Sequence, residues 1–140
     1  SNFARPGHRS MHNSNYWKGI AYLGLGPSAH SYNIKTRQWN VSNNHLYIQS
    51  IQEGNIPFEI ETLDTATSFN EYMMISLRLM EGVELAEIEK RFGPAYVAHT
   101  QMVQANLFAE GKLAPTTAGF AIAKNARFIA DGIASEFFIV

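Results

Sequence analysis

The sequence contains no cysteine, and this absence excludes several classes of site. Disulfide-stapled folds, zinc sites built on thiolates and iron–sulfur clusters held by protein thiolates all require cysteine side chains. The sequence also lacks an apolar run long enough to span a membrane. A chain without cysteine is compatible with the cytoplasm but does not establish that location. We expect a cytoplasmic protein with no membrane span.

Acidic residues are missing from the first 52 positions, and all 12 of them lie from Glu53 onward. The first 52 residues nevertheless carry five Lys or Arg residues and four of the five histidines. This change in composition predicts two structural units. The basic unit would attract an anionic ligand such as a phosphate or carboxylate, or it packs against an acidic or apolar partner domain, and both readings stay open. The sequence begins without Met, which suggests a fragment.

The 140 residues are 46% hydrophobic and 16% charged, which predicts a buried core in one domain or two small ones. Helix-forming residues are few in the first forty positions. Residues 20–26, "IAYLGLG", are the clearest strand candidate because glycines bound an apolar run, and residues 31–41 could hold a second strand. Two short strands are a poor fold by themselves, so we interpret them as one edge of a larger sheet.

From residue 44 onward the pattern becomes helical. A short helix is predicted with Asn44 as its N-cap and Gly54 as its stop. The strongest helix spans residues 68–82, with Ser68 and Glu71 as a capping box. Its apolar residues fall on one predicted inner face: Phe69, Tyr72, Met73, Leu77 and Met80.

The remaining sequence predicts two helices, a hairpin and a last helix. The first helix covers residues 84–93, and the second begins at Pro94 and is closed by Gly111. Residues 112–123 predict the hairpin, and residues 127–137 the last helix. Helical spacing assigns these inward positions: Leu85, Ile88, Phe92, Ile129, Ile133 and Phe137. The order resembles a winged-helix module, but the helix before the hairpin has no Lys or Arg, so we expect no nucleic-acid partner.

The motif Gly24-x-Gly26-x-x-Ala29 has the spacing of a dinucleotide-binding loop. Such a loop follows a strand, opens a helix and precedes an acid about 20 residues further on. Residues 30–40 lack helical periodicity, and the first acid after Gly26 is Glu53. The dinucleotide reading therefore fails, and we interpret the segment as a strand end where small residues allow close approach.

The stretch "HNSNYW" combines an imidazole, two amides and two large aromatic rings. Tyr16 and Trp17 offer flat faces on which a planar ring could stack, or they seal the base of a core. His8 and His12 are four residues apart, but this segment holds no carboxylate or thiolate to complete a metal site. One histidine suffices as an axial ligand of haem iron, although a lone histidine is more often structural.

Several stretches now form a recognisable order: "SNFARPG", "HNSNYW", "YLGLGPSAHS", "EYMMISLRLMEGV", "RFG" and "FIADGI". In this order they resemble the C-terminal part of the oxygen-independent coproporphyrinogen III oxidase family, and specifically its HemW-like branch of haem chaperones. The resemblance covers nearly the whole chain. It implies that residues 1–40 are the last strands of a partial α/β barrel, and that residues 41–140 form a mainly helical, winged-helix-like C-terminal domain with a small hairpin. The expected fold class is α+β.

The resemblance also implies cofactors and site residues. Family members are radical S-adenosylmethionine proteins with a four-iron four-sulfur cluster on a Cys-x-x-x-Cys-x-x-Cys loop, which this sequence lacks, so we expect neither cofactor on this chain. The glycine segment ends near the cofactor and substrate cavity, which gives these candidate cofactor-binding residues: Gly24, Gly26, Ala29 and His30. The neighbouring segment gives these candidate substrate- or haem-binding residues: His12, Asn13, Tyr16 and Trp17. Either His12 or His30 is the candidate haem ligand.

Three functional hypotheses follow from the resemblance. The parent protein binds haem and delivers it, or it decarboxylates coproporphyrinogen III oxidatively to protoporphyrinogen IX. Alternatively, the fragment is only an interaction or lid domain, and we predict that it is catalytically inactive by itself. A porphyrin suits the aromatic residues and, through its anionic propionates, the basic N-terminal unit. The expected partners are the N-terminal barrel of the same chain and porphyrin or haem. A homodimer is a further candidate because unpaired strand edges recruit partners.

Overall fold

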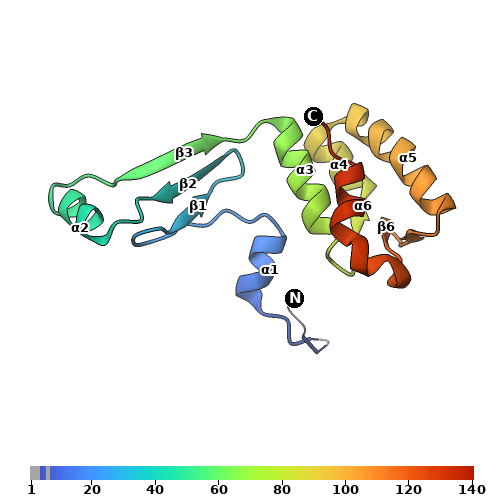
Figure 1. Cartoon of the computed structure of the whole chain (residues 1–140), viewed down its shortest axis with the longest axis horizontal. Coiled ribbons are helices and arrows are strands. Elements are labelled where there is room, and N and C mark those ends of the chain that lie inside the picture. Colours follow the sequence, from blue (N-terminus) through green and yellow to red (C-terminus); the bar gives the residue numbers. More distant parts are fainter. Residues whose placement is uncertain (1–3, 6) are drawn as a thin grey trace. The chain divides into compact units, whose positions relative to one another are not determined.

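The computed structural model describes residues 4, 5 and 7–140, and the chain in it divides into two compact units (Figure 1). Unit 1 is Ser1–Leu63 and unit 2 is Asp64–Val140. Part of the "SNFARPG" stretch lies outside the described residues. The division lies after residue 63, and the strand at residues 58–62 belongs to unit 1 because it pairs with the strand that ends at residue 40. The assignment of residues 1–40 to barrel strands and of residues 41–140 to a C-terminal domain stays a prediction.

Unit 1 combines two short helices with a three-stranded antiparallel sheet. Along the chain these elements are α1 (Met11–Trp17), β1 (His30–Tyr32), β2 (Thr36–Asn40), α2 (Asn44–Gln52) and β3 (Phe58–Thr62). The strand order is β1-β2-β3, so β2 is central and β3 forms an edge. In the register, Trp39 of β2 faces His30 on one side and Glu59 on the other.

Two local predictions in unit 1 need correction. Residues 20–26 form no strand; only Tyr22 makes an isolated bridge, through two 2.9 Å backbone hydrogen bonds with Tyr32. The N-cap of α2 is Asn43 and not Asn44, because the Asn43 Oδ1 accepts the N–H groups of His45 and Leu46. Strand β3 was not predicted, although its Phe-Glu-Ile-Glu-Thr sequence alternates with the period of a strand.

Unit 2 has the predicted order of helices and hairpin. Its elements are α3 (Thr65–Ser76), β4 (Val83–Glu84), α4 (Leu85–Phe92), α5 (Pro94–Ala109), β5 (Leu113–Pro115), β6 (Gly119–Ile122), the 3-10 turn η1 (Lys124–Ile129) and α6 (Ala130–Glu136). Strands β4, β6 and β5 form a small antiparallel sheet with β6 in the middle. Together the two units confirm the α+β class.

Three helix predictions in unit 2 differ from the structure at their ends. Helix α3 begins after Asp64, whose Oδ1 accepts the Thr67 N–H at 2.6 Å, so the capping box expected at residue 68 is wrong. The same helix ends at Ser76, which leaves Met80 exposed. Before α6 the chain forms the 3-10 turn, so Ile129 is exposed as well.

The hydrophobic core belongs to unit 2. Every buried hydrophobic residue in the described part of the chain lies in that unit. Phe69 sits among three rings, with its centroid 5.5 Å from Phe92, 4.9 Å from Tyr96 and 6.1 Å from His99. In unit 1 the only described buried side chain is Asn40. Unit 1 therefore gains little hydrophobic stabilisation from its own residues.

The C-terminal tail is fixed to unit 2 by side-chain amide and imidazole groups. The Asn70 Nδ2 donates to the Ile139 carbonyl oxygen, and the Ile139 N–H donates to the Asn70 Oδ1, each at 2.9 Å. The His99 Nε2 lies 2.8 Å from the carbonyl oxygen of Phe137.

None of the helices in the described residues combines the length and the hydropathy required to cross a membrane.

Candidate functional site

The first candidate surface lies on α1. His12 and Tyr16 are four residues apart on this helix, so their side chains share a face. Their ring centroids are 4.9 Å apart in an edge-to-face arrangement, and Tyr16 makes a similar contact with Tyr22 at 4.8 Å. These three rings, together with Asn15 and Ile20, line most of a hollow of about 80 Å³. We call it the α1 hollow.

The other two predicted residues of this segment have different surroundings. Asn13 donates its backbone N–H to the Oγ of Ser10, the N-cap of α1, at 3.3 Å. Trp17 is the last residue of the helix and is half-buried. The structure therefore brings His12 and Tyr16 together, whereas Asn13 and Trp17 are not among the residues that line the α1 hollow.

The glycine segment folds back on the chain's own sheet. The Gly24 N–H donates to the Ser31 Oγ at 3.0 Å, and a Cβ at Gly24 would collide with the backbone carbonyl of His30. Gly26 has a φ of 102°, a conformation that favours glycine, and it donates its N–H to the Tyr47 hydroxyl at 3.3 Å. The close approach that small residues permit at Gly24 is therefore an approach of backbone to backbone.

The turn that follows is fixed to β2 by Asn40. Its Nδ2 donates to the Gly26 carbonyl oxygen at 2.9 Å, and its backbone N–H donates to the Ala29 carbonyl oxygen at 2.9 Å. Ser28, in the left-handed region at φ 59°, donates its N–H to the Val41 carbonyl oxygen at 3.2 Å. Because Asn40 is only 4% exposed, its two hydrogen bonds are partly shielded from water, and they hold His30 at the start of β1.

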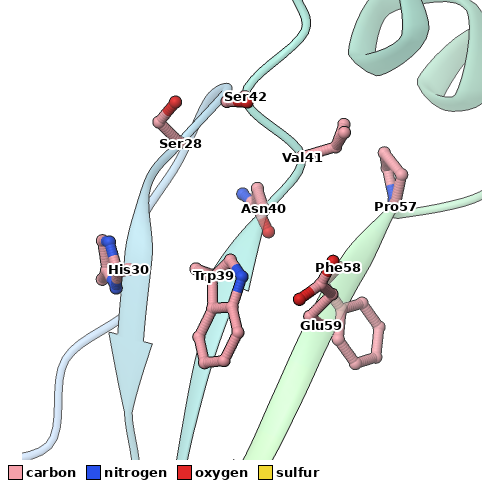
Figure 2. A pocket seen from close by; sticks show the side chains of 9 residues that line it. All are labelled: Ser28, His30, Trp39, Asn40, Val41, Ser42, Pro57, Phe58 and Glu59. Carbon is pink, nitrogen blue, oxygen red and sulfur yellow. The ribbon is translucent and has the colours of Figure 1, made fainter.

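The second candidate surface is an open hollow of about 530 Å³ on the sheet (Figure 2). We call it the sheet hollow. Figure 2 shows that His30, Trp39 and Glu59 reach it from three neighbouring strands. They form one row of the register, and the ring centroids of His30 and Trp39 are 6.2 Å apart. The sequence motifs predict only His30 of this row, because Trp39 and Glu59 meet it only through strand pairing.

The two hollows differ in charge and contain different candidate residues. Glu59 contributes a carboxylate to the sheet hollow, whereas none of the described residues that line the α1 hollow is acidic. His12 lines the α1 hollow and His30 the sheet hollow, so the structure does not bring the two histidines into one hollow. Among the described residues, no group of three or more His, Cys, Asp or Glu side chains is placed to bind a metal ion.

No protein-family model matches this chain, but curated proteins and a solved structure do. The haem chaperone HemW of Mycobacterium tuberculosis is 35% identical over 89 residues, which cover 63% of this chain and 23% of that protein. HemW of Bacillus subtilis is 35% identical over 94 residues, covering 66% of this chain and 25% of that protein. The radical SAM enzyme HemN, coproporphyrinogen III oxidase from Escherichia coli, superposes with a TM-score of 0.63 at 21% identity. The chain is HemN/HemW-like.

The match to HemN covers 84% of the HemN/HemW-like chain and 28% of HemN, so it spans both units described above and establishes the fold. The HemN/HemW-like chain spans about a quarter of the length of the curated HemW proteins it matches. It offers no thiolate for an iron–sulfur cluster, because its sequence contains no cysteine. The exposed His12 imidazole on α1 and the neighbouring rings of Tyr16 and Tyr22 are groups of the kind that contact a planar metalloporphyrin.

Proposed function

We propose that this chain is part of a radical S-adenosylmethionine protein that binds haem and delivers it to haem proteins. The observation that carries the proposal is the 35% identity to curated haem chaperones. In this proposal unit 1 supplies part of the haem-binding surface, and the α1 hollow is its centre. The parent protein acts in the cytoplasm, as expected for the family.

His12 is the proposed axial ligand. Haem iron needs only one or two protein ligands, and an exposed imidazole can provide one. Tyr16 and Tyr22 stand beside it and offer faces and edges for the porphyrin ring. The first 52 residues carry basic groups but no acidic ones, which favours the anionic propionates. In the same proposal Asn13 and Trp17 contact the rim of the porphyrin.

His30 is the weaker candidate for iron, because Glu59 lines the same hollow and would repel a propionate. We assign His30, which lines the sheet hollow, and the preceding segment with Gly24, Gly26 and Ala29 to the S-adenosylmethionine side of the parent's cavity. The carboxylate of Glu59 and the indole face of Trp39, which line the sheet hollow with His30, suit the cationic sulfonium and ammonium groups of that cofactor. The iron–sulfur cluster, which supplies the electron for its cleavage, is bound by cysteines outside this chain.

The N-terminal barrel of the parent is the proposed partner of unit 1. This unit has no buried hydrophobic residue among those described, while Leu23 and Leu25 are 75% and 84% exposed. Exposed apolar side chains beside a poor core favour packing against another domain. Without the cluster, this chain should not cleave S-adenosylmethionine. The measurement is 5′-deoxyadenosine under reducing conditions, and its formation by this chain would contradict the proposal.

A haem titration of the full-length parent tests the ligand assignment. The Soret band reports the iron ligands, so His12→Ala should shift the band and weaken binding by about tenfold or more, because a coordinating imidazole is lost. His30→Ala should bind haem nearly as the wild type does. His45→Ala, which alters an exposed histidine on α2, is the matched control. Unchanged binding and an unchanged Soret band in His12→Ala would refute the assignment.

The second candidate function is oxidative decarboxylation of coproporphyrinogen III, which the fold similarity to HemN favours. The full-length parent is given coproporphyrinogen III, S-adenosylmethionine and a reductant, and protoporphyrinogen IX is measured. Stoichiometric product would replace the chaperone proposal with the oxidase. If both haem binding and product are absent, the remaining candidate is an interaction or lid domain without chemistry.

A further inference from the structure

Strand β3 is an edge strand with one open side. It pairs with β2, and no strand of the described residues lies along its other edge. All five residues of β3 are exposed, including Phe58 at 48% and Ile60 at 58%. An exposed edge of this kind has unpaired N–H and C=O groups and acts as a template for a further strand.

Backbone hydrogen bonds identify which residues face the open edge. The Val41 N–H donates to the Pro57 carbonyl oxygen at 3.0 Å, and the Leu63 N–H donates to the Lys35 carbonyl oxygen at 2.9 Å. Hydrogen-bonded pairs alternate along an antiparallel ladder, so the odd-numbered residues of β3 direct their backbone toward β2. The even-numbered residues therefore present their N–H and C=O groups to the open edge: Phe58, Ile60 and Thr62.

The side chains of β3 alternate between two kinds. Glu59 and Glu61 project from one face, and the exposed apolar side chains of Phe58 and Ile60 project from the other. Within the sheet, Arg37 lies opposite Glu61, whereas an uncharged residue, Trp39, lies opposite Glu59. The carboxylate of Glu59 is therefore the less compensated of the two, and the edge is negative on one face and apolar on the other.

A second copy of the chain fits this edge poorly. Antiparallel self-pairing must join even-numbered residues, because only they have free backbone groups on that side. When Ile60 of one copy lies opposite Ile60 of the other, each Glu59 lies opposite the Glu61 of the other copy. A shift of the register by two residues instead puts the two Glu59 side chains, or the two Glu61 side chains, opposite each other. These acids would occupy the non-hydrogen-bonded pairs, where side chains are closest and like charges repel. The edge thus disfavours the homodimer that an unpaired strand would otherwise favour.

We propose that β3 accepts an added antiparallel strand from a partner protein, and that this strand alternates basic and apolar residues. Its Lys or Arg residues would lie opposite Glu59 and Glu61, and its apolar residues opposite Phe58, Ile60 and Thr62. Backbone hydrogen bonds supply affinity in this mode of binding, and the alternate side chains supply selectivity. The proposal rests on the sheet edge and does not depend on haem binding.

The first experiment uses two capped peptides and hydrogen exchange followed by NMR. One peptide alternates Val and Lys, and the other replaces each Lys by Glu. The Val–Lys peptide should bind and slow amide exchange at Phe58, Ile60 and Thr62, with no comparable change at Glu59 and Glu61, whose N–H groups already face β2. Equal binding of both peptides, or protection of only the odd-numbered residues, would overturn the proposal.

Variants of the edge provide the second experiment. Ile60→Pro removes an outward N–H that β2 does not use, so it should weaken the Val–Lys peptide at least tenfold, while the control Ile60→Val should not. Glu59→Lys should invert the preference between the peptides. It also places opposite charges in the 59–61 pairs of the self-paired register, so light scattering should detect a dimer at concentrations where the wild type is a monomer.

Two other occupants would contradict the proposal. If the wild type itself dimerises and Ile60→Pro abolishes the dimer, a second copy occupies the edge. If this chain binds the Val–Lys peptide but the full-length parent does not, the rest of the parent covers β3. Should Ile60→Pro unfold unit 1, Glu59→Lys still decides the question, because an unchanged peptide preference in that variant would refute charge selection.

Discussion

Replacing Phe69 by Ala tests whether the aromatic cluster of unit 2 is the centre of its stability. Phe69 has no exposed surface and contacts the rings of Phe92, Tyr96 and His99. Removing a fully buried Phe costs about 3–5 kcal/mol through lost burial and the cavity that remains. A domain gains about 0.05–0.15 kcal/mol per residue, so unit 2 should have roughly 4–12 kcal/mol in total. The substitution therefore removes a large part of its stability.

Urea unfolding followed by far-UV circular dichroism measures this loss. Phe128→Ala is the matched control: the same substitution in the same unit, at a side chain whose exposure is 103%. It should change the free energy of unfolding by no more than about 0.5 kcal/mol. The reasoning is refuted if Phe69→Ala loses less than about 1.5 kcal/mol, or no more than the control.

Three further predictions concern unit 2. Asn70→Ala removes both hydrogen bonds to Ile139 and should cost about 1–3 kcal/mol in urea unfolding; unchanged stability would show that the tail is not held by this amide. The Thr67 N–H holds the pKa of Asp64 below its ordinary value, so this stabilisation is present above the ordinary carboxyl pKa and is lost as the pH falls through the lowered one. Melting temperatures measured across acid pH should show this loss in the wild type and not in Asp64→Asn, which keeps a helix cap without a charge. Parallel pH profiles of the two proteins would contradict the prediction. Gly132→Ala adds a Cβ that meets no atom within 4 Å in helix α6, so it should stabilise unit 2 by about 0.5–1 kcal/mol, and a loss of stability would show an unrecognised constraint there.

Residues typical of helix ends predicted the bounds of some helices almost to the residue. Helix α5 runs from Pro94 to Ala109, as a proline at the first helical position and Gly111 beyond the end had indicated. The start of α3 was placed too late, because Ser68 and Glu71 have the spacing of a capping box while Asp64, four residues earlier, makes the actual cap. Several side chains can cap a helix, and the sequence does not decide which one the backbone selects.

The sequence predicts only those contacts of the candidate site that join residues close to each other in the chain. His12 and Tyr16 are four residues apart on one helix, so their contact follows from helical geometry. The row of His30, Trp39 and Glu59 depends on the pairing of three strands, and Glu59 is 29 positions from His30 in the sequence. A single-residue slip in either pairing would send its members to opposite faces of the sheet. Register of this kind is set by tertiary structure, which no short motif encodes.

The placement of the two tryptophans, Trp17 on α1 and Trp39 on β2, makes the units optically distinct. Indole emission arises from unit 1 alone, while most of the helical ellipticity comes from unit 2. A ligand that quenches or shifts the emission therefore reports an event on the sheet or beside α1. Loss of ellipticity without a change in emission reports an event in the helical unit. A single sample can thus follow binding and unfolding as separate signals, without a label.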